Sequence, residues 1–261
     1  MIHQDQVGFL RQRNSSDNIR RLLNIMWSVR NMDSPVAAIS LDAQKAYDRV
    51  EHKYLFLTLK SFGFGEPFLK WIQILYNQPE AAVQTNGLIS SYFKLSRGTP
   101  QGSSLSPALF CLALEPLAAA IRMNPNFPGV VIGESVHKLM LYADDILLLV
   151  SDPEQSIHTL LETINSFSKL SGYKVNWSKS EALPLTAYCP RTLFQEGAFQ
   201  WPAEGLKYLG ITFPQQIDDV IRVNMEPLFR KISTYCGEVV PPINVNVGKS
   251  KCTKNELHSE A

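Results

Sequence analysis

The feature that most constrains this chain is the tetrad Tyr142-Ala143-Asp144-Asp145, which separates two apolar runs, 137–141 and 146–150. Runs of this length and composition predict the two strands of a hairpin with the acids at its tip. Ionised carboxylates beside apolar strands are unfavourable unless they are paired or bound to a metal ion, because desolvation is costly. An isolated Asp-Asp pair in a turn usually points into water, so a further observation is needed.

Asp42 supplies that observation. Pro35 opens the apolar run 36–41, which predicts a buried strand that ends at Asp42. If this strand joins the hairpin in one sheet, Asp42 and the Asp144-Asp145 pair meet at one edge. Converging carboxylates suit Mg²⁺, with Mn²⁺ as an alternative. Two ions about 3.5 to 4 Å apart activate a 3′-hydroxyl and stabilise a leaving pyrophosphate. The pattern therefore favours nucleotidyl transfer.

The other patterns predict helices around this sheet. Apolar residues at helical spacing follow the capping residues Ser16 and Asp17. A polar loop, 97–104, leads into a helix with Ser106 as N-cap and Pro107 at its first position. Further helices are expected over 53–62, 67–76, 157–167 and 220–232, a hairpin at Asn86-Gly87, and a strand over 208–213. The expected fold class is α+β, with an antiparallel sheet packed on helices.

Composition narrows the class of protein. The chain has 261 residues, is 45% hydrophobic, and carries 25 Lys plus Arg against 24 Asp plus Glu. Any nucleic-acid site must therefore be a local patch. The 4 cysteines have no zinc-binding spacing. The longest apolar run, 108–121, is interrupted by Glu115 and Pro116 and is shorter than the roughly 20 residues of a membrane span. We expect a soluble intracellular chain that contacts no membrane.

The acids lie in motifs that resemble those of reverse transcriptases. Residues 41–48, around Asp42, resemble the first palm motif of that family, and 97–107, with Pro100-Gln101-Gly102 at the centre, resemble the second. The third, fourth and fifth motifs are matched by 142–145, 171–180 and 208–210. The motifs follow the family's order. Residues 8–9, 17–21, 45–48 and 226–228 make the LINE-type, or non-LTR, retrotransposons the nearest resemblance.

This resemblance implies a right-hand polymerase palm with partial fingers and a largely missing thumb. Residues 1–214 would form the fingers-palm domain and 215–236 the start of a thumb-like helix. Residues 237–261, which lack an apolar period, would be a disordered tail. The implied activity is that of an RNA-directed DNA polymerase, which adds dNTPs to a DNA primer on an RNA template. LINE proteins are longer at both ends, so we expect a truncated core whose activity is impaired.

The resemblance also assigns roles to single residues. Asp42, Asp144 and the main-chain carbonyl of Ala43 would hold two metal ions, while Asp145 would support the site electrostatically. Lys179 would protonate the leaving pyrophosphate.

Other residues would bind the nucleotide and the primer. Arg13 would grip the triphosphate, a role that suits its planar guanidinium. Tyr47 would exclude a ribose 2′-hydroxyl, and Gln101 and Gly102 would lie against the incoming nucleotide. Tyr208-Leu209-Gly210 would contact the primer.

Several of these assignments have a structural alternative. Tyr47 and Tyr208-Leu209-Gly210 also suit a core, since aromatic residues usually pack. Gln101-Gly102 also suits a plain turn, and Lys179 an ordinary surface lysine. Two further functions stay open: a non-catalytic retroelement remnant that binds RNA or a protein, and an RNA-dependent RNA polymerase. Tyr47 and the Pro-Gln-Gly segment argue against the second.

Overall fold

The centre of the molecule is a four-stranded antiparallel sheet in the order β10-β1-β9-β8. The structure is a computed structural model and describes residues 1–100, 102–189 and 199–236. The strands are β1 (Val36–Leu41), β8 (Leu139–Tyr142), β9 (Asp145–Ser151) and β10 (Glu181–Pro184). The predicted strand before Asp42, the hairpin around the acids and the α+β fold class with its antiparallel sheet are confirmed.

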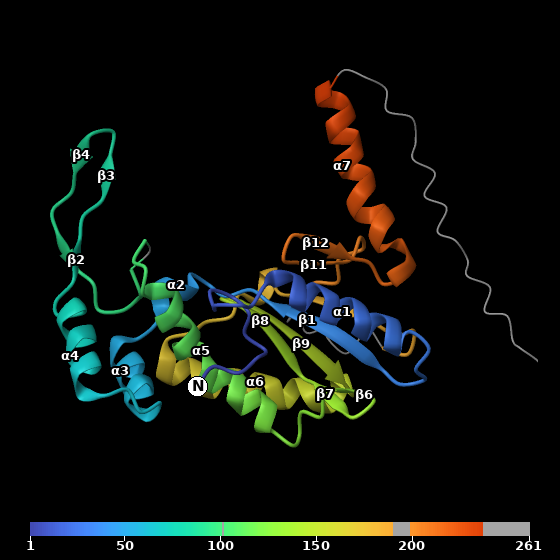
Figure 1. Cartoon of the computed structure of the whole chain (residues 1–261), viewed down its shortest axis with the longest axis horizontal. Helices are drawn as coiled ribbons and strands as arrows, with labels where there is room; N and C mark the ends of the chain where they lie inside the picture. Colours follow the sequence, from blue (N-terminus) through green and yellow to red (C-terminus); the bar gives the residue numbers. More distant parts are fainter. Residues whose placement is uncertain (101, 190–198, 237–261) are drawn as a thin grey trace, which may run out of the picture.

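Helices cover both faces of this sheet (Figure 1). Along β9, Ile146, Leu148 and Val150 enter one hydrophobic cluster, whereas Leu147 and Leu149 enter another. The first cluster includes residues of α5 (Ser106–Met123) and α6 (Pro153–Ser171), and the second includes residues of α1 (Ser15–Val29) and of the hairpin β11 (Leu206–Tyr208)–β12 (Ile211–Phe213). Burial on both faces explains why the sequence of β9 is a continuous apolar run and does not alternate with polar residues.

The remaining elements surround this core. After β1 come α2 (Ala46–Arg49), α3 (His52–Ser61) and α4 (Glu66–Leu75), then β2 (Glu80–Ala81), which pairs with β5 (Phe93–Lys94), and β3 (Gln84–Thr85), which pairs with β4 (Leu88–Ile89). Later elements are β6 (Val130–Ile132), β7 (Ser135–His137), the short helices η1 (Trp177–Lys179) and η3 (Ile217–Asp219), and α7 (Val220–Cys236). In Figure 1 the β3–β4 hairpin and α7 both project from the body of the molecule.

Helix α5 is the core helix of the fold. Among the described residues it alone is long and apolar enough to cross a membrane, but 61% of it is buried inside the molecule. It contacts α3, α6 and β8. Its apolar length is therefore explained by packing.

Three local predictions need correction. Residues 208–213 are not one strand, because Leu209 and Gly210, at φ 48° and 81°, form a turn between β11 and β12. Ser106 is the first residue of α5 and not its N-cap, and its hydroxyl donates to the carbonyl of Pro100 at 2.6 Å. Helix α1 begins at Ser15, behind Asn14 as N-cap. The predicted tail, 237–261, lies outside the described residues.

Because β9 is buried on both faces, we expect substitutions in it to lower the free energy of unfolding more than substitutions in the projecting hairpin. Leu148 in β9 is 0% exposed, whereas Leu88 in the projecting hairpin is 78% exposed. Leu148→Ala should lower the free energy of unfolding by about 2 to 5 kcal/mol, because it leaves a cavity between two packed layers. Leu88→Ala should change it by less than about 0.5 kcal/mol. Urea denaturation measures both, and equal losses would contradict the assigned positions of the two leucines.

Candidate active site

The register of the sheet brings the three acids to one end. β1 and β9 pair Ser40 with Leu147 and Leu41 with Ile146, so Asp42 follows in register opposite Asp145. β8 and β9 pair Tyr142 with Asp145, which leaves Ala143 and Asp144 as a two-residue turn. The carboxylates of Asp42, Asp144 and Asp145 therefore belong to adjacent strand ends.

These carboxylates influence one another electrostatically. Desolvation by burial and the charge of Asp42 raise the pKa of Asp144, although a main-chain hydrogen bond opposes the shift. Desolvation and the charges of Asp144 and Asp42 raise the pKa of Asp145 to about 6, even though part of that residue is exposed. Within the described ranges, none of the three acids forms an ion pair with Lys, Arg or His. No basic side chain of the described residues therefore neutralises these acids through an ion pair.

The residues present fit a divalent cation that is only partly ligated by side chains. In the part of the chain that the structure describes, no three His, Cys, Asp or Glu side chains form a ready-made metal cluster. Mg²⁺ commonly takes one or two carboxylates and completes its shell with water and substrate phosphates. Two aspartates and a main-chain carbonyl suit that ligand set.

Ala43, the residue with the candidate carbonyl, is held by its neighbours. The N–H of Asn176 donates to the carbonyl of Asp42, and the N–H of Gln44 donates to that of Lys174, both at 2.8 Å. Ala43 and Val175 thereby form an isolated antiparallel bridge. The backbone on the carboxyl side of Asp42 is fixed by these bonds.

Ser180 and Asn176, which the sequence did not single out, position Asp42 further. The N–H of Asp42 donates to the hydroxyl of Ser180 at 3.2 Å, and that hydroxyl donates to the carbonyl of Asn176 at 2.9 Å. Both residues lie in the fourth motif, on either side of the short helix η1. Their place in that motif was the only sign in the sequence that they could lie near Asp42. Lys179 directly precedes Ser180 and is exposed. The structure thus brings the backbone at Lys179 near Asp42.

Tyr47 combines a packed ring with a position near the acids. The ring stacks on Phe110 with centroids 4.4 Å apart, and its hydroxyl is buried without a hydrogen-bond partner in the described ranges. Burial, and then the charge of Asp144, raise the pKa of Tyr47 well above its usual value. Tyr173, another residue that the sequence did not single out, has its pKa raised by burial and then by Asp144 and Asp42.

The loop of the second motif is tied to the first motif. The N–H of Thr99 donates to the carbonyl of Tyr47 at 2.7 Å, and that of Gly98 donates to the carbonyl of Val50 at 2.8 Å. Gly102 has φ 86°, a left-handed conformation, and a Cβ there would meet open space. The left-handed backbone conformation, and not a lack of space, is therefore the reason for glycine at position 102. Gln101 lies outside the described residues.

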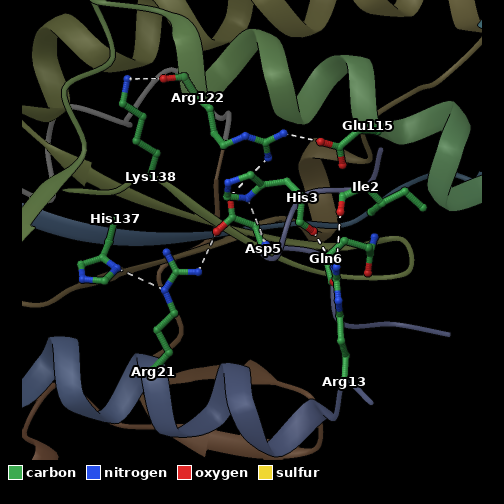
Figure 2. A network of polar contacts seen from close by, with 10 residues as sticks. All are labelled: Ile2, His3, Asp5, Gln6, Arg13, Arg21, Glu115, Arg122, His137 and Lys138. Atoms are coloured by element: carbon green, nitrogen blue, oxygen red, sulfur yellow. Dashed lines mark hydrogen bonds and ion pairs between the residues drawn. The ribbon is translucent and has the colours of Figure 1, made fainter. Parts of the chain in front are cut away.

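Arg13 is not brought to the acids by the contacts that it makes. Its guanidinium donates to the carbonyls of His3 and Gln6, each at 2.6 Å, and to that of Ile2 at 3.3 Å (Figure 2). A role in gripping a triphosphate requires that these bonds be exchanged.

Tyr208 is a core residue. It is 2% exposed, and its hydroxyl accepts a hydrogen bond at 3.0 Å from Asn18, which also donates to the carbonyl of Leu141. Burial raises the pKa of Tyr208 well above its usual value, and the charge of Asp145 adds to this. The side chain therefore links β11 to α1 and β8. Gly210 in the adjoining turn is exposed.

Comparison with known proteins agrees with this fold. The family described as "Reverse transcriptase (RNA-dependent DNA polymerase)" matches residues 1–213, and the chain belongs to this family. The chain is 13% identical to telomerase from Candida tropicalis, with a TM-score of 0.57, over 84% of this chain and 34% of that one. At this identity the likeness concerns the fold alone.

The sequence relatives are proteins of mobile elements. A Xenopus laevis protein of transposon TX1 is 31% identical over 216 residues, which are 81% of this chain and 16% of that protein. The Pol polyprotein of the Drosophila melanogaster element R2DM is 28% identical over 80% of this chain and 20% of its own length. The polymerase of mobile element jockey, from the same fly, is 24% identical over 93% and 27%. The resemblance to LINE-type retrotransposons is confirmed, and the chain spans under a third of these relatives.

The raised pKa of Asp145 predicts how stability depends on pH. The folded-state pKa of about 6 lies above the ordinary 3.8, so the folded chain binds more protons between these values. Stability is therefore lost as pH rises through that window. In buffer without divalent ions, Asp145→Asn should raise the free energy of unfolding at about pH 8 and have little effect at about pH 4.

Urea denaturation across this pH range measures the effect. Asp33→Asn, at an exposed acid outside the cluster, controls for the loss of one surface charge. An Asp145→Asn gain that is equal at both ends of the range would contradict the account.

Proposed function

We propose that residues 1–214 are the fingers-palm core of an RNA-directed DNA polymerase, and that 215–236 begin a thumb-like segment. In this proposal the core transfers nucleotides from dNTPs to the 3′-hydroxyl of a DNA primer paired with an RNA template. The observation that carries it is the juxtaposition of Asp42 with Asp144 and Asp145 at one sheet end, without a basic partner in the described ranges. Membership of the reverse transcriptase family supports the same chemistry.

The acids would hold the metal ions. Asp42, Asp144 and the carbonyl of Ala43 would ligate two Mg²⁺ or Mn²⁺ ions, and Asp145 would add negative charge. When bound, such ions supply a lowered pKa for the attacking hydroxyl and neutralise charge on the leaving pyrophosphate. Lys179, exposed at the end of η1, would donate a proton to that pyrophosphate.

The nucleotide and primer would be bound around this centre. Tyr47 would close the space beneath the sugar, since its ring is braced by Phe110 and its hydroxyl lies near Asp144. Gln101 and Gly102 would lie against the nucleotide. Arg13 would reach the triphosphate only after releasing its main-chain carbonyls.

The primer contact would come from Leu209 and Gly210. Tyr208 would anchor their turn from within the core, because its side chain is buried against Asn18.

Removal of a metal-binding carboxylate tests the mechanism. In a primer-extension assay with an RNA template, dNTPs and Mg²⁺, Asp144→Asn should lower the rate by about a thousandfold, since about 4 kcal/mol of charge stabilisation is lost. Asp33→Asn should keep the wild-type rate. Incorporation that survives Asp144→Asn would refute the metal assignment. Wild-type binding of nucleic acid without metal-dependent extension would favour the non-catalytic alternative.

A smaller side chain at Tyr47 tests the selection of the sugar. Tyr47→Val should raise the use of rNTPs relative to dNTPs by about 10- to 100-fold, because the barrier to the 2′-hydroxyl is removed. Tyr54→Val is a matched control, since Tyr54 is a packed tyrosine whose hydroxyl donates to the carbonyl of Ala113 in α5. It should lower stability and leave the nucleotide preference unchanged. A wild-type preference for rNTPs would favour an RNA-dependent RNA polymerase.

A further inference from the structure

Gln6 holds the turn that carries Asp144. Its side chain is 1% exposed, and its Oε1 accepts hydrogen bonds from the N–H groups of Ala143 at 2.9 Å and Gly8 at 2.8 Å. Its Nε2 donates to the carbonyl of Ala143 at 3.1 Å. Only this orientation of the amide matches two donors at one end and an acceptor at the other. Gln6 therefore binds both main-chain groups of the residue that precedes Asp144.

The held residue has an unusual conformation. Ala143 has φ 53°, in the left-handed region that residues with a side chain rarely adopt. It is also buried, so its N–H and carbonyl need partners within the protein. Because the carbonyl of Ala143 belongs to the peptide bond with Asp144, its hydrogen bond to Gln6 fixes the direction from which the Asp144 side chain leaves the backbone.

Gln6 is itself held on the edge of the central sheet. The N–H of Val7 donates to the carbonyl of Leu141, and the N–H of Leu141 donates to the carbonyl of Asp5, both at 2.9 Å. Gln6 thus forms a parallel bridge with Leu141 of β8. Gly8 lies so close to the turn that a Cβ would come within 2.3 Å of the Ala143 nitrogen.

Ion pairs fasten the same segment to helices on both faces of the sheet. The carboxylate of Asp5, 4% exposed, pairs with Arg21 of α1 at 2.8 Å and with Arg122 of α5 at 3.2 Å. Figure 2 shows Asp5 between these two helices, with Arg13 bound to the carbonyls nearby. The backbone around Gln6 is therefore held by contacts that do not involve Ala143, so its amide is preorganised to bind the turn.

We propose that Gln6 is a positioning residue for the catalytic centre: it fixes the Ala143 peptide so that Asp144 is presented beside Asp42. This rests on the proposed function, and Gln6 itself touches no reacting group. Partners of this kind, one step behind a metal ligand, typically contribute about 10- to 100-fold to metal affinity or activity.

The test compares two buried side-chain amides, that of Gln6, which binds the turn at Ala143, and that of Asn18, which binds Leu141 in β8. Gln6→Leu removes the bonds to the turn, and Gln6→Asn keeps an amide that is one methylene too short to span them. Asn18→Leu is the control, because Asn18 binds Leu141 and Tyr208 but not the turn. The readouts are Mn²⁺ affinity by electron paramagnetic resonance, amide hydrogen exchange of residues 143–145, single-nucleotide incorporation and urea denaturation, all on the full chain.

Both Gln6 variants should weaken Mn²⁺ binding by at least about tenfold, lower kcat more than they raise KM for the dNTP, and speed exchange at 143–145. Asn18→Leu should reduce stability by a similar amount and change Mn²⁺ affinity by less than about twofold. The proposal is overturned if Gln6 and Asn18 variants lose affinity in proportion to stability, or if exchange at 143–145 is unchanged in the Gln6 variants. If the wild-type chain neither binds Mn²⁺ nor extends a primer, the proposed function fails, and exchange at 143–145 still decides whether Gln6 holds the turn.

Discussion

The carboxylates of Asp42, Asp144 and Asp145 form a cluster at the end of the central sheet, where desolvation by burial, and then repulsion between the acids, raise the pKa of Asp144 and bring that of Asp145 to about 6. Such a cluster is unfavourable for the folded chain alone. It persists because β1 and β9 are paired along their length and β9 is covered on both faces, so the strand ends cannot separate without disturbing the core. The free energy gained from packing thus offsets the repulsion between the acids and keeps them close together, where they can bind a cation.

The backbone around the acids is held from two sides. On one side, Ser180 and Asn176 bind the main chain at Asp42, and on the other side Gln6 binds the main chain at Ala143. These contacts come from segments far from the acids in sequence, and each uses hydrogen bonds to backbone atoms, so the carboxylates themselves are left available for ligands. Preorganisation of this kind reduces the reorganisation that accompanies reaction.

Much of the fold was predictable because its signals are local. The apolar runs of β1 and β9, the Asn86-Gly87 turn and the spacing within α6 each depend on neighbouring residues. The turn at Leu209-Gly210 escaped prediction because apolar residues continue through it, and a leucine at φ 48° has no sequence signature. The hydrogen bonds of Gln6 to the Ala143 turn and those of Arg13 to main-chain carbonyls could not be predicted, since both depend on how the N-terminal segment lies beside β8. For Tyr208 the sequence left a core position and a primer contact open, and only the packing of β11 against α1 and β8 shows that its side chain is in the core.

The central claim is that Asp42 and Asp144 hold a divalent cation jointly, and a double-mutant cycle of Mn²⁺ binding tests it most directly. Mn²⁺ affinity would be measured for the wild-type chain, Asp42→Asn, Asp144→Asn and the double variant. Shared ligation predicts a loss of at least about tenfold in each single variant and little further loss in the double variant, because the two acids serve one site. Wild-type affinity in either single variant, or losses that simply add, would contradict it.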